Sequence, residues 1–403
     1  MILAWTVFKH FYPYFDAVGT DWDAVLPGAL TRAASDKDEA AFLDTLRGLV
    51  AQLHDGHGAV AMARLARQYR LPVEWRFLGD SLVVTVAGPE SPGGAAPRPG
   101  DTVTAIDGVP VADLYARLSP LISAATEQWR RWSAQGELTL RAAPDPVTLS
   151  LRHPDGTTAE ATVTPLPAGK VSLAEKRPAD GAQVAPGIVY LNLDDRRIGV
   201  VVRMMKTLSE AKGVIFDLRG YPNDGAVEAL QHLSDQKLTS PKWNVPTITM
   251  PDQKDVKYQT SNWTLPPKTP RITGQVAFLT DGRAISYAES CMGIVEGFKL
   301  GEIVGGPTAG TNGNINPFGL PGGYNISWTG MKVLKTDDSR HHGVGIQPTV
   351  PVSPTAAGIA AGRDEVLEKA VEVLTAKIKT EPAAPAPAPA PAPARTENTP
   401  APK

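Results

Sequence analysis

Residues 275–300 read QVAFLTDGRAISYAESCMGIVEGFKL, and this stretch decides most of the fold. The apolar run QVAFLT is followed by a short polar loop and then by a helical pattern that begins near Ser286. A continuous apolar run is typical of a strand buried on both faces of a parallel sheet. The order of apolar strand, turn and helix recurs after GIVYLNL and in GVIFDLRGYPNDG, at residues 187–193 and 213–225. We therefore predict an α/β core with a mostly parallel sheet.

The chain before this core shows two different sequence patterns. Apolar residues recur at helical spacing in DEAAFLDTLRGLVAQLHDGHGAV, whereas short alternating runs such as SLVVTVAG and VTLSLRHPDGTTAEATVTPL follow. Asp155-Gly156 suits a tight hairpin turn between two such strands. We predict a helical N-terminal unit at 1–66, a β-rich domain at 67–167, the α/β core at 168–378 and an extended Pro/Ala-rich tail at 379–403.

Composition excludes several classes of protein. The 403 residues carry a net charge of −2, so no basic field attracts nucleic acid, and we expect no nucleic-acid partner. The single cysteine, Cys291, permits no intrachain disulfide and reads as a buried structural thiol. No apolar run is long enough for a transmembrane segment. The N-terminus shows no export signal, so we expect a periplasmic or secreted protein if a leader is missing and a cytoplasmic one otherwise; the oligomeric state is left open.

Four segments carry residues suited to chemistry. Ser286 at a helix start lies beside N–H groups that can bind an oxyanion, although Ser286 and Glu289 also match a capping box. The turn from Gly220 to Asp224 can aim backbone amides at a neighbouring loop. His57, in LHDGHGAV, is flanked by glycines and free to reach another domain; a metal site lacks further ligands there. His341 and His342 precede a glycine-rich strand and are expected near the active site.

Taken together, the chain resembles the C-terminal-processing (tail-specific) serine peptidase family across roughly residues 5–375. The resemblance rests on the order of the D-G-H turn, PGDTVTAIDGVPV at 99–111, which is similar to PDZ modules of these proteases, and four core motifs. These are VIFDLRGYPNDG, DGRAISYAE, VGGPTAG and GVGIQPTVPV. The resemblance implies a crotonase/Clp-like α/β peptidase core with an inserted PDZ-like domain, a serine nucleophile and no cofactor.

The resemblance also implies site residues. One branch of the family uses a lysine about 25 residues after the serine, but Thr311 stands there and Lys299 lies too far along the serine's own helix. The tricorn-like branch takes its base from a histidine before the PDZ-like domain, which is His57 here. Ser286 is then the nucleophile, and a third group is His342 or Asp338. The amides of Tyr287 and of the turn containing Gly220 and Asn223 are expected to hold the oxyanion.

The implied substrate is a polypeptide captured by strand addition to the PDZ-like domain, with Tyr69-Arg70-Leu71-Pro72 as a candidate carboxylate-binding loop. Asn223-Asp224 replaces the paired glycines of the family's oxyanion turn, and Thr349 replaces its usual aspartate. A catalytically weak or inactive peptide- or ligand-binding protein is therefore the alternative. An acyl-CoA enzyme of the crotonase type is disfavoured by the PDZ-like insert and by the lack of a basic cluster.

Overall fold

The structure is a computed structural model that describes residues 1–88, 96–194 and 197–380. The N-terminal unit is helical because its helices have an apolar face and two of them begin at a capping aspartate. The carboxylates of Asp21 and Asp38 accept the N–H groups of Ala24 and Ala41 at 3.2 and 2.9 Å. The unit consists of α1 (Ile2–Phe11), α2 (Phe15–Val18), α3 (Trp22–Ser35), α4 (Glu39–Ala51), β1 (Ala59–Met62) and the 3₁₀ helix η1 (Ala63–Leu65).

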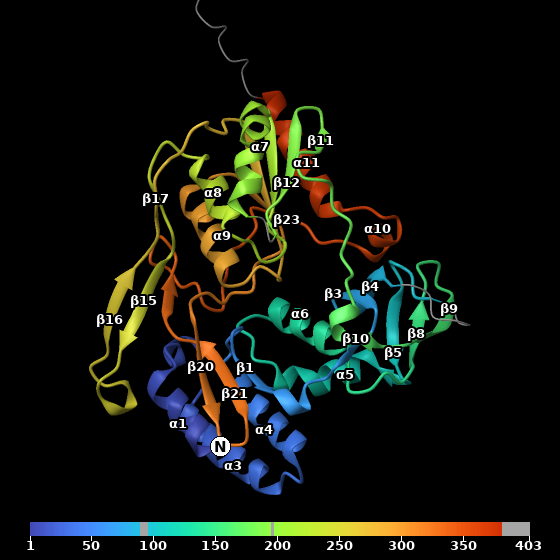
Figure 1. The fold of residues 1–403 in the computed structure, drawn as a ribbon, viewed down its shortest axis with the longest axis vertical. Helices are drawn as coiled ribbons and strands as arrows, with labels where there is room; N and C mark the ends of the chain where they lie inside the picture. Colours follow the sequence, from blue (N-terminus) through green and yellow to red (C-terminus); the bar gives the residue numbers. More distant parts are fainter. Residues whose placement is uncertain (89–95, 195–196, 381–403) are drawn as a thin grey trace, which may run out of the picture.

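A distant hairpin completes the core of this unit. Its two strands are β20 (Ile315–Leu320) and β21 (Tyr324–Thr329), and β21 pairs antiparallel with β1, with Ala59 opposite Ser327. The side chains of Ile326 and Trp328 pack in one cluster with Phe8 and Tyr12 of the helical segment. Figure 1 shows the hairpin, in orange, lying against the blue N-terminal helices. The N-terminal unit therefore shares its hydrophobic core with residues that follow the α/β core in sequence.

The β-rich domain is built on a sheet of alternating buried and exposed residues, with the pattern buried–intermediate–buried along VTLSLR. Gly156 takes a φ of +87° in the hairpin turn, as Asp155-Gly156 predicted. The main sheet has the order β3-β4-β5-β8-β9, and β6 pairs with β5. The elements are β2 (Tyr69–Arg70), β3 (Val73–Leu78), β4 (Ser81–Ala87), β5 (Thr102–Ile106), β6 (Val109–Pro110), α5 (Val111–Leu118), η2 (Ser119–Leu121), α6 (Glu127–Glu137), β7 (Leu140–Arg141), β8 (Val147–Arg152), β9 (Thr158–Val163), β10 (Leu166–Pro167) and η3 (Ala168–Lys170).

The α/β core is a six-stranded sheet with the order β11-β12-β13-β18-β19-β23, parallel except for β11. Every residue of GVIFD is buried, which explains its uninterrupted apolar pattern. The elements are β11 (Gln183–Ala185), β12 (Ile188–Asn192), α7 (Ile198–Glu210), β13 (Gly213–Asp217), α8 (Gly225–Gln231), β18 (Gln275–Thr280), α9 (Tyr287–Phe298), β19 (Glu302–Gly305), β23 (Val350–Pro351), α10 (Ala356–Ala360) and α11 (Glu365–Thr380).

Helices cover both faces of this sheet. Helices α7, α8 and α9 pack on one face and α11 packs on the other. Each fully buried aliphatic side chain, such as Ile294 on α9 or Leu374 on α11, contributes roughly 1.5–3 kcal/mol relative to exposure. Cys291 lies in the first of these layers, and burial raises the pKa of its thiol to about 12, as fits a structural thiol. The layers hold strand β18 and helix α9 rigidly on either side of Ser286.

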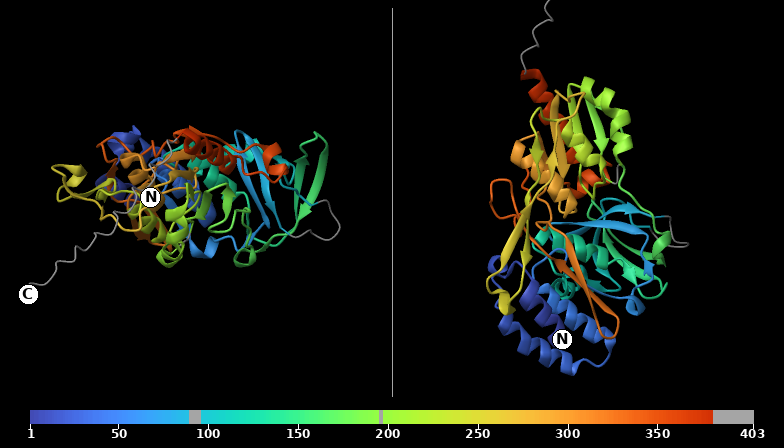
Figure 2. Two further views of the ribbon diagram at one scale, coloured as in Figure 1. Left: turned by 90° about the horizontal axis from the view of Figure 1, so that it is seen from above. Right: turned by 60° about the vertical axis from the view of Figure 1, so that its left-hand side comes forward.

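Shorter strands form an arm at the side of the core. A three-stranded sheet, β16-β15-β22, extends beside the N-terminal unit (Figure 1), and the β-rich domain lies on the other side of the molecule (Figure 2). The remaining elements are β14 (Leu238–Thr239), β15 (Lys242–Thr247), η4 (Pro251–Gln253), β16 (Lys257–Ser261), β17 (Thr264–Leu265) and β22 (Lys332–Leu334).

The predicted fold class is confirmed: a mixed α/β core, a helical N-terminal region and a β-rich region are all present. Among the described helices, none is both apolar and long enough to cross a bilayer. The predicted tail falls almost entirely in residues 381–403, outside the described residues, as does most of the glycine- and proline-rich stretch at 89–95.

Candidate active site

Ser286 lies between β18 and α9 in a backbone conformation that L residues rarely adopt, with φ 59° and ψ −114°. A serine that only caps a helix has an extended backbone instead. Conformations of this kind cost on the order of 1–3 kcal/mol and persist where the surroundings enforce them. Here the N–H of Ser286 donates to the carbonyl oxygen of Thr311 at 2.9 Å. The hydrogen bond to Thr311, in the loop after β19, therefore stabilises the unusual backbone conformation of Ser286.

Glu289 connects that loop to helix α9, which begins directly after Ser286. Its carboxylate is fully buried and accepts the N–H groups of Gly310 and Thr311 at 2.7 and 2.9 Å and the hydroxyl of Thr308. It also lies 3.4 Å from the N–H of Ser286, which is one half of the capping box that the sequence suggested. Glu289 thus fixes the loop and the serine relative to each other.

His57 follows the last N-terminal helix and precedes β1, so the β1–β21 pairing sets its position. Its side chain is 8% exposed, and its Nδ1 lies 2.9 Å from the Thr329 hydroxyl at the end of β21. That hydroxyl donates to Oδ1 of Asp55 at 2.7 Å. The same carboxylate accepts the N–H groups of His57 at 3.1 Å and Thr329 at 2.6 Å. Imidazole, hydroxyl and carboxylate therefore form one buried hydrogen-bonded chain.

This chain of hydrogen bonds fixes the proton on the His57 ring. The Thr329 hydroxyl has one proton, which it gives to Asp55, so it can only accept from Nδ1. His57 is then the tautomer with Nδ1–H, and Nε2 is free to accept a proton. Burial lowers the pKa of His57 below its ordinary value of 6.5, while the charges of Asp55 and Glu289 oppose part of that shift. The imidazole is therefore neutral at neutral pH.

Thr311 connects the histidine turn to the serine loop. Its hydroxyl accepts the N–H of Gly56 at 2.9 Å, and its carbonyl accepts the N–H of Ser286. A Cβ on Gly56 would meet the Thr311 hydroxyl at 2.7 Å and the Ile285 side chain at 3.1 Å, so a side chain does not fit at this position. Ser286 itself and Gly56, the residue before His57, thus both contact Thr311. Thr311, at the position where the other branch of the family has a lysine, therefore connects the His57 turn to the Ser286 loop.

The turn after β13 approaches the first turn of α9. The ring of Tyr221, which follows Gly220, lies 6.2 Å from the ring of Tyr287, which follows Ser286. The N–H of Tyr287 is among the first four of the helix, which have no acceptor within it. In the turn, Asn223 accepts the N–H of Asp224 at 2.8 Å. The two segments that were expected to bind the oxyanion therefore carry neighbouring side chains.

The two candidates for a third group differ in position: Asp338 lies at the surface, whereas His342 lies close enough to Asp55 and Glu289 for their charges to act on it. Asp338 is 64% exposed in its side chain and pairs with Lys242 at 2.6 Å. His342 is buried, stacks on Tyr14 with ring centroids 4.0 Å apart and contacts the carbonyl of His54 at 3.0 Å. Neither has a recorded contact with His57 or Ser286 among the described residues. The pair that does contact the His57 ring and its partner hydroxyl, Thr329 and Asp55, was missed by the sequence reasoning.

The reason for that omission is specific. Asp55 lies inside the quoted segment LHDGHGAV, but its contact with the imidazole runs through Thr329, 272 residues along the chain. The stretch YNISWT looks like any alternating strand, and no local signal shows that it pairs with β1. His341, by contrast, is near the site as expected, with Nε2 3.3 Å from the Glu289 carboxylate.

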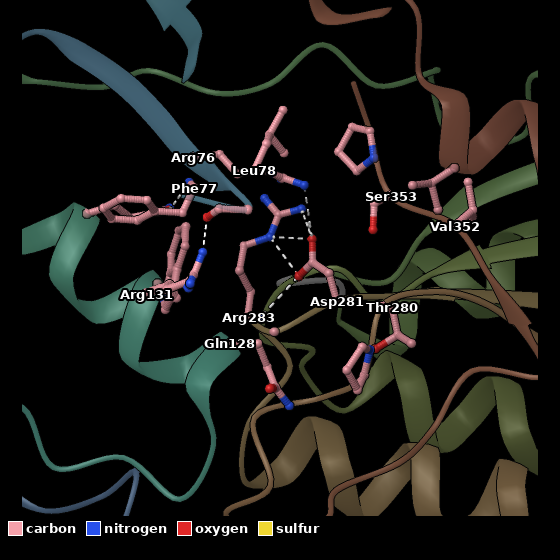
Figure 3. A pocket seen from close by; sticks show the side chains of 18 residues that line it. Arg76, Phe77, Leu78, Gln128, Arg131, Thr280, Asp281, Arg283, Val352 and Ser353 are labelled. Carbon is pink, nitrogen blue, oxygen red and sulfur yellow. Dashed lines mark hydrogen bonds and ion pairs between the residues drawn. The ribbon is translucent and has the colours of Figure 1, made fainter. Parts of the chain in front are cut away.

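A cavity of about 360 Å³ separates the β-rich domain from the core (Figure 3). Strand β3 and helix α6 form one wall, and the loop between β18 and Ser286 forms another. Arg283 of this loop donates to Asp281 and Glu175, and Arg76 of β3 donates to Glu175 at 2.8 Å. Burial alone raises the pKa of Glu175, yet Arg283 and Arg76 lower it to about 2. The arginines and carboxylates of this wall therefore balance each other's charge, and their ion pairs connect β3 to the loop before Ser286.

The YRLP segment does not face this cavity. Residues Tyr69 and Arg70 form β2, which pairs on both sides with β10 and β7. The guanidinium of Arg70 donates to Glu74 at 2.7 Å, and the N–H of Leu71 donates to the carbonyl of Thr139. The guanidinium of Arg70 and the N–H of Leu71 thus already have partners within the domain, and the carboxylate-binding role of this loop stays a prediction.

Comparison with known proteins agrees with this core. The model of "Peptidase family S41" matches residues 188–352, whereas a search of curated proteins gives no match. Mature CPAF in complex with lactacystin aligns with a TM-score of 0.77 at 15% identity, covering 94% of this chain and 98% of that one. Mature CPAF alone gives 0.75 at 15% identity, with 94% and 96% covered. A protein from Parabacteroides merdae gives 0.56 at 16% identity, with 93% and 95% covered. At these identities the likeness shows a shared fold.

The α/β core is that of a serine-type peptidase. Residues 188–352 form a domain of peptidase family S41, which confirms the resemblance to the C-terminal-processing serine peptidases. The substrate class that follows is polypeptide.

Proposed function

We propose that the protein is a serine endopeptidase of the tricorn-like branch, with Ser286 as nucleophile and His57 as general base. The observation that carries the proposal is the left-handed backbone of Ser286, at φ 59°, held by the Thr311 loop. A helix cap gains nothing from such strain, whereas a nucleophile gains a fixed position beside the helix N-terminus. The contact of Gly56 with Thr311 supports the pairing of His57 with this serine.

In the proposed reaction, Nε2 of His57 removes the hydroxyl proton of Ser286 as the oxygen attacks the peptide carbonyl carbon. The negative charge that develops on the carbonyl oxygen is bound by the N–H of Tyr287 and by the N–H of Gly220 in the turn after β13. The N–H groups of Tyr221 and Asp224 in that turn already donate to Asp194 and Asn223. The imidazolium then protonates the leaving amine, the C–N bond breaks, and an acyl ester remains on Ser286. Water, deprotonated by the same imidazole, hydrolyses this ester and restores the serine.

Thr329 and Asp55 take the orienting role that the sequence analysis gave to His342 or Asp338. The hydroxyl accepts from Nδ1 of His57, and the carboxylate stabilises the positive charge that forms on the ring. Asp55 raises the pKa of His57 through its charge, which favours the imidazolium during proton transfer.

Substrate capture is proposed for the edge of β3. This strand is the terminal strand of the sheet and, among the described strands, pairs only with β4, so its other backbone edge is the one to which an extended peptide would add. The N–H of Phe77 on this edge donates to the side-chain oxygen of Gln135 of α6 at 3.1 Å, which a peptide backbone can replace. Because the adjoining cavity reaches Arg283, a captured chain lies close to the serine loop.

The chemistry is tested with a fluorophosphonate probe and unfolded casein. We expect wild-type protein to be labelled and to cleave casein, and Ser286→Ala and His57→Ala to lose both while keeping their circular dichroism spectra. Ser290→Ala is the matched control, because Ser290 lies one turn along the same helix and its hydroxyl donates to Asn312 at 3.1 Å. Casein cleavage that survives in Ser286→Ala would refute the assignment.

Capture is tested separately in the Ser286→Ala protein with a fluorescent unfolded peptide. Leu78→Asp places a charge on the cavity wall and is expected to weaken peptide binding about tenfold or more. Val245→Asp, on the exposed arm, is the control that leaves binding unchanged. Equal affinities of the two variants would contradict capture at β3.

A further inference from the structure

Two tyrosines flank the proposed oxyanion position. Tyr287 follows Ser286 directly, and Tyr221 follows Gly220, so the backbone segments expected to bind the oxyanion also carry aromatic rings. The two rings lie 6.2 Å apart at an angle of 40°. The side chain of Tyr221 is among the most exposed large apolar residues of the described chain, at 52%. An aromatic ring left open to solvent beside a nucleophile is available for contact with a substrate.

Further aromatic rings support this pair from behind. Trp263 lies 5.4 Å from Tyr287 in an edge-on arrangement, and Trp243 lies 4.9 Å from Trp263. Trp243 belongs to β15, and the N–H of Trp263 donates to the Ser240 hydroxyl at 2.9 Å, so both indoles are anchored by backbone contacts. Edge-to-face packing of this kind restricts ring motion. Trp243, Trp263, Tyr287 and Tyr221 therefore form a continuous series of ring contacts that ends in an apolar surface.

The charges near this surface are acidic. The carboxylate of Asp194 accepts the N–H of Tyr221 at 2.9 Å, and that of Asp224 accepts the N–H of Ile198 at 2.8 Å. Arg177 lies 3.9 Å from Asp194 but also contacts buried Asp217, so its charge is shared. An acidic side chain of a substrate would meet like charges here, which disfavours its binding.

From this arrangement we propose that the peptidase selects a large apolar residue, aromatic or long aliphatic, on the amino side of the cleaved bond. This residue carries the scissile carbonyl, so its Cα is bonded to the carbon that Ser286 attacks. When the carbonyl oxygen faces the amides of Tyr287 and the Gly220 turn, the side chain of the same residue reaches the rings of Tyr287 and Tyr221. The inference rests on the proposed function of Ser286.

The test uses quenched fluorescent peptides that differ only at this residue, with Phe, Leu, Gly, Lys or Asp. We expect kcat/KM for Phe and Leu to exceed that for Gly by roughly tenfold, the effect of one well-packed aromatic contact, and Asp to be the poorest. Tyr221→Ala should reduce the Phe-to-Gly ratio about tenfold, and Tyr221→Phe should restore it. Tyr258→Ala, which removes an exposed tyrosine on β16, is the matched control and keeps the wild-type ratio.

Each result decides between the two claims. If peptides are cleaved with a preference for Lys or Asp, or if Tyr221→Ala leaves the Phe-to-Gly ratio unchanged, this inference is overturned while Ser286 remains the nucleophile. If wild-type protein cleaves no peptide and is not labelled by a fluorophosphonate, the proposed function fails and the inference falls with it. Comparing a ratio within each variant separates selectivity from general loss of activity.

Discussion

Replacing Thr329 with valine tests the hydrogen-bonded chain that orients His57. Valine has nearly the same shape but no hydroxyl, so Nδ1 of His57 loses its acceptor and Oδ1 of Asp55 loses a donor 2.7 Å away. Leaving such buried groups unsatisfied costs about 1–3 kcal/mol. The imidazole ring is then free to turn or to change tautomer. Restoring its productive orientation adds this free energy to the activation barrier, so we expect kcat/KM to fall roughly 10- to 100-fold.

Stability should change less than activity in this variant. Asp55 keeps the N–H groups of His57 and Thr329, at 3.1 and 2.6 Å, whichever side chain follows. We therefore expect the free energy of unfolding in urea to fall by only about 1 kcal/mol. Thr329→Ser retains the hydroxyl, and we expect it to recover most of the activity.

The assay is the rate of fluorophosphonate labelling together with casein hydrolysis, each measured for wild type, Thr329→Val and Thr329→Ser. A Thr329→Val enzyme within about twofold of wild type, in a preparation where Ser286→Ala is inactive, would show that the hydroxyl does not orient the base. Equal losses in the valine and serine variants would point instead to packing.

Three further results are expected. Because catalysis needs neutral His57 and burial lowers its pKa, the acid limb of kcat/KM against pH should lie below 6.5, and Asp55→Asn should move it lower still; a limb above 6.5 contradicts this. Burial lowers the pKa of His342 to about 4, so the unfolded chain takes up a proton between pH 6.5 and 4 that the folded chain does not. The free energy of unfolding should therefore fall as pH falls through that range, and urea unfolding of His342→Gln should show a smaller drop. Glu289→Gln replaces one carboxylate oxygen with an NH2 donor, which then faces the N–H of either Gly310 or Thr311. Unfolding should therefore become easier by roughly 1–3 kcal/mol, and labelling of the serine should be lost; a fully labelled variant refutes this role.

The sequence predicts the parts of the fold that depend on local pattern. The run GVIFD is buried along its whole length, and the serine after QVAFLT stands at the start of a helix, so apolar continuity was a sufficient signal for both. The burial of the strand and the start of the helix need only neighbouring residues to be predicted. His57 was indicated instead by the order of the family motifs along the chain, together with its flanking glycines.

The orienting groups depend on pairing between distant strands, and sequence patterns do not specify which strands pair. Asp338 precedes the GVGIQPTVPV strand in sequence, but its turn has a φ of +66° and its carboxylate pairs with Lys242 at the surface. Thr329 acquires its contact only because β21 lies beside β1. A single sequence does not show which residues of β1 and β21 face each other. In the structure, the N–H groups that the buried Asp55 carboxylate accepts, from His57 and Thr329, make this pairing evident.

The pairing of β1 with β21 has a consequence for how activity arises during synthesis. A growing chain that ends before residues 315–329 already contains both His57 and Ser286, but it lacks the strand and the hydroxyl that hold the imidazole. N-terminal segments fold first as they emerge from the ribosome. Under the proposed roles of Ser286 and His57, we therefore expect the nascent chain to be inert. Local opening of this hairpin in the finished molecule should remove the hydroxyl contact of His57 while the contact of Ser286 with Thr311 remains.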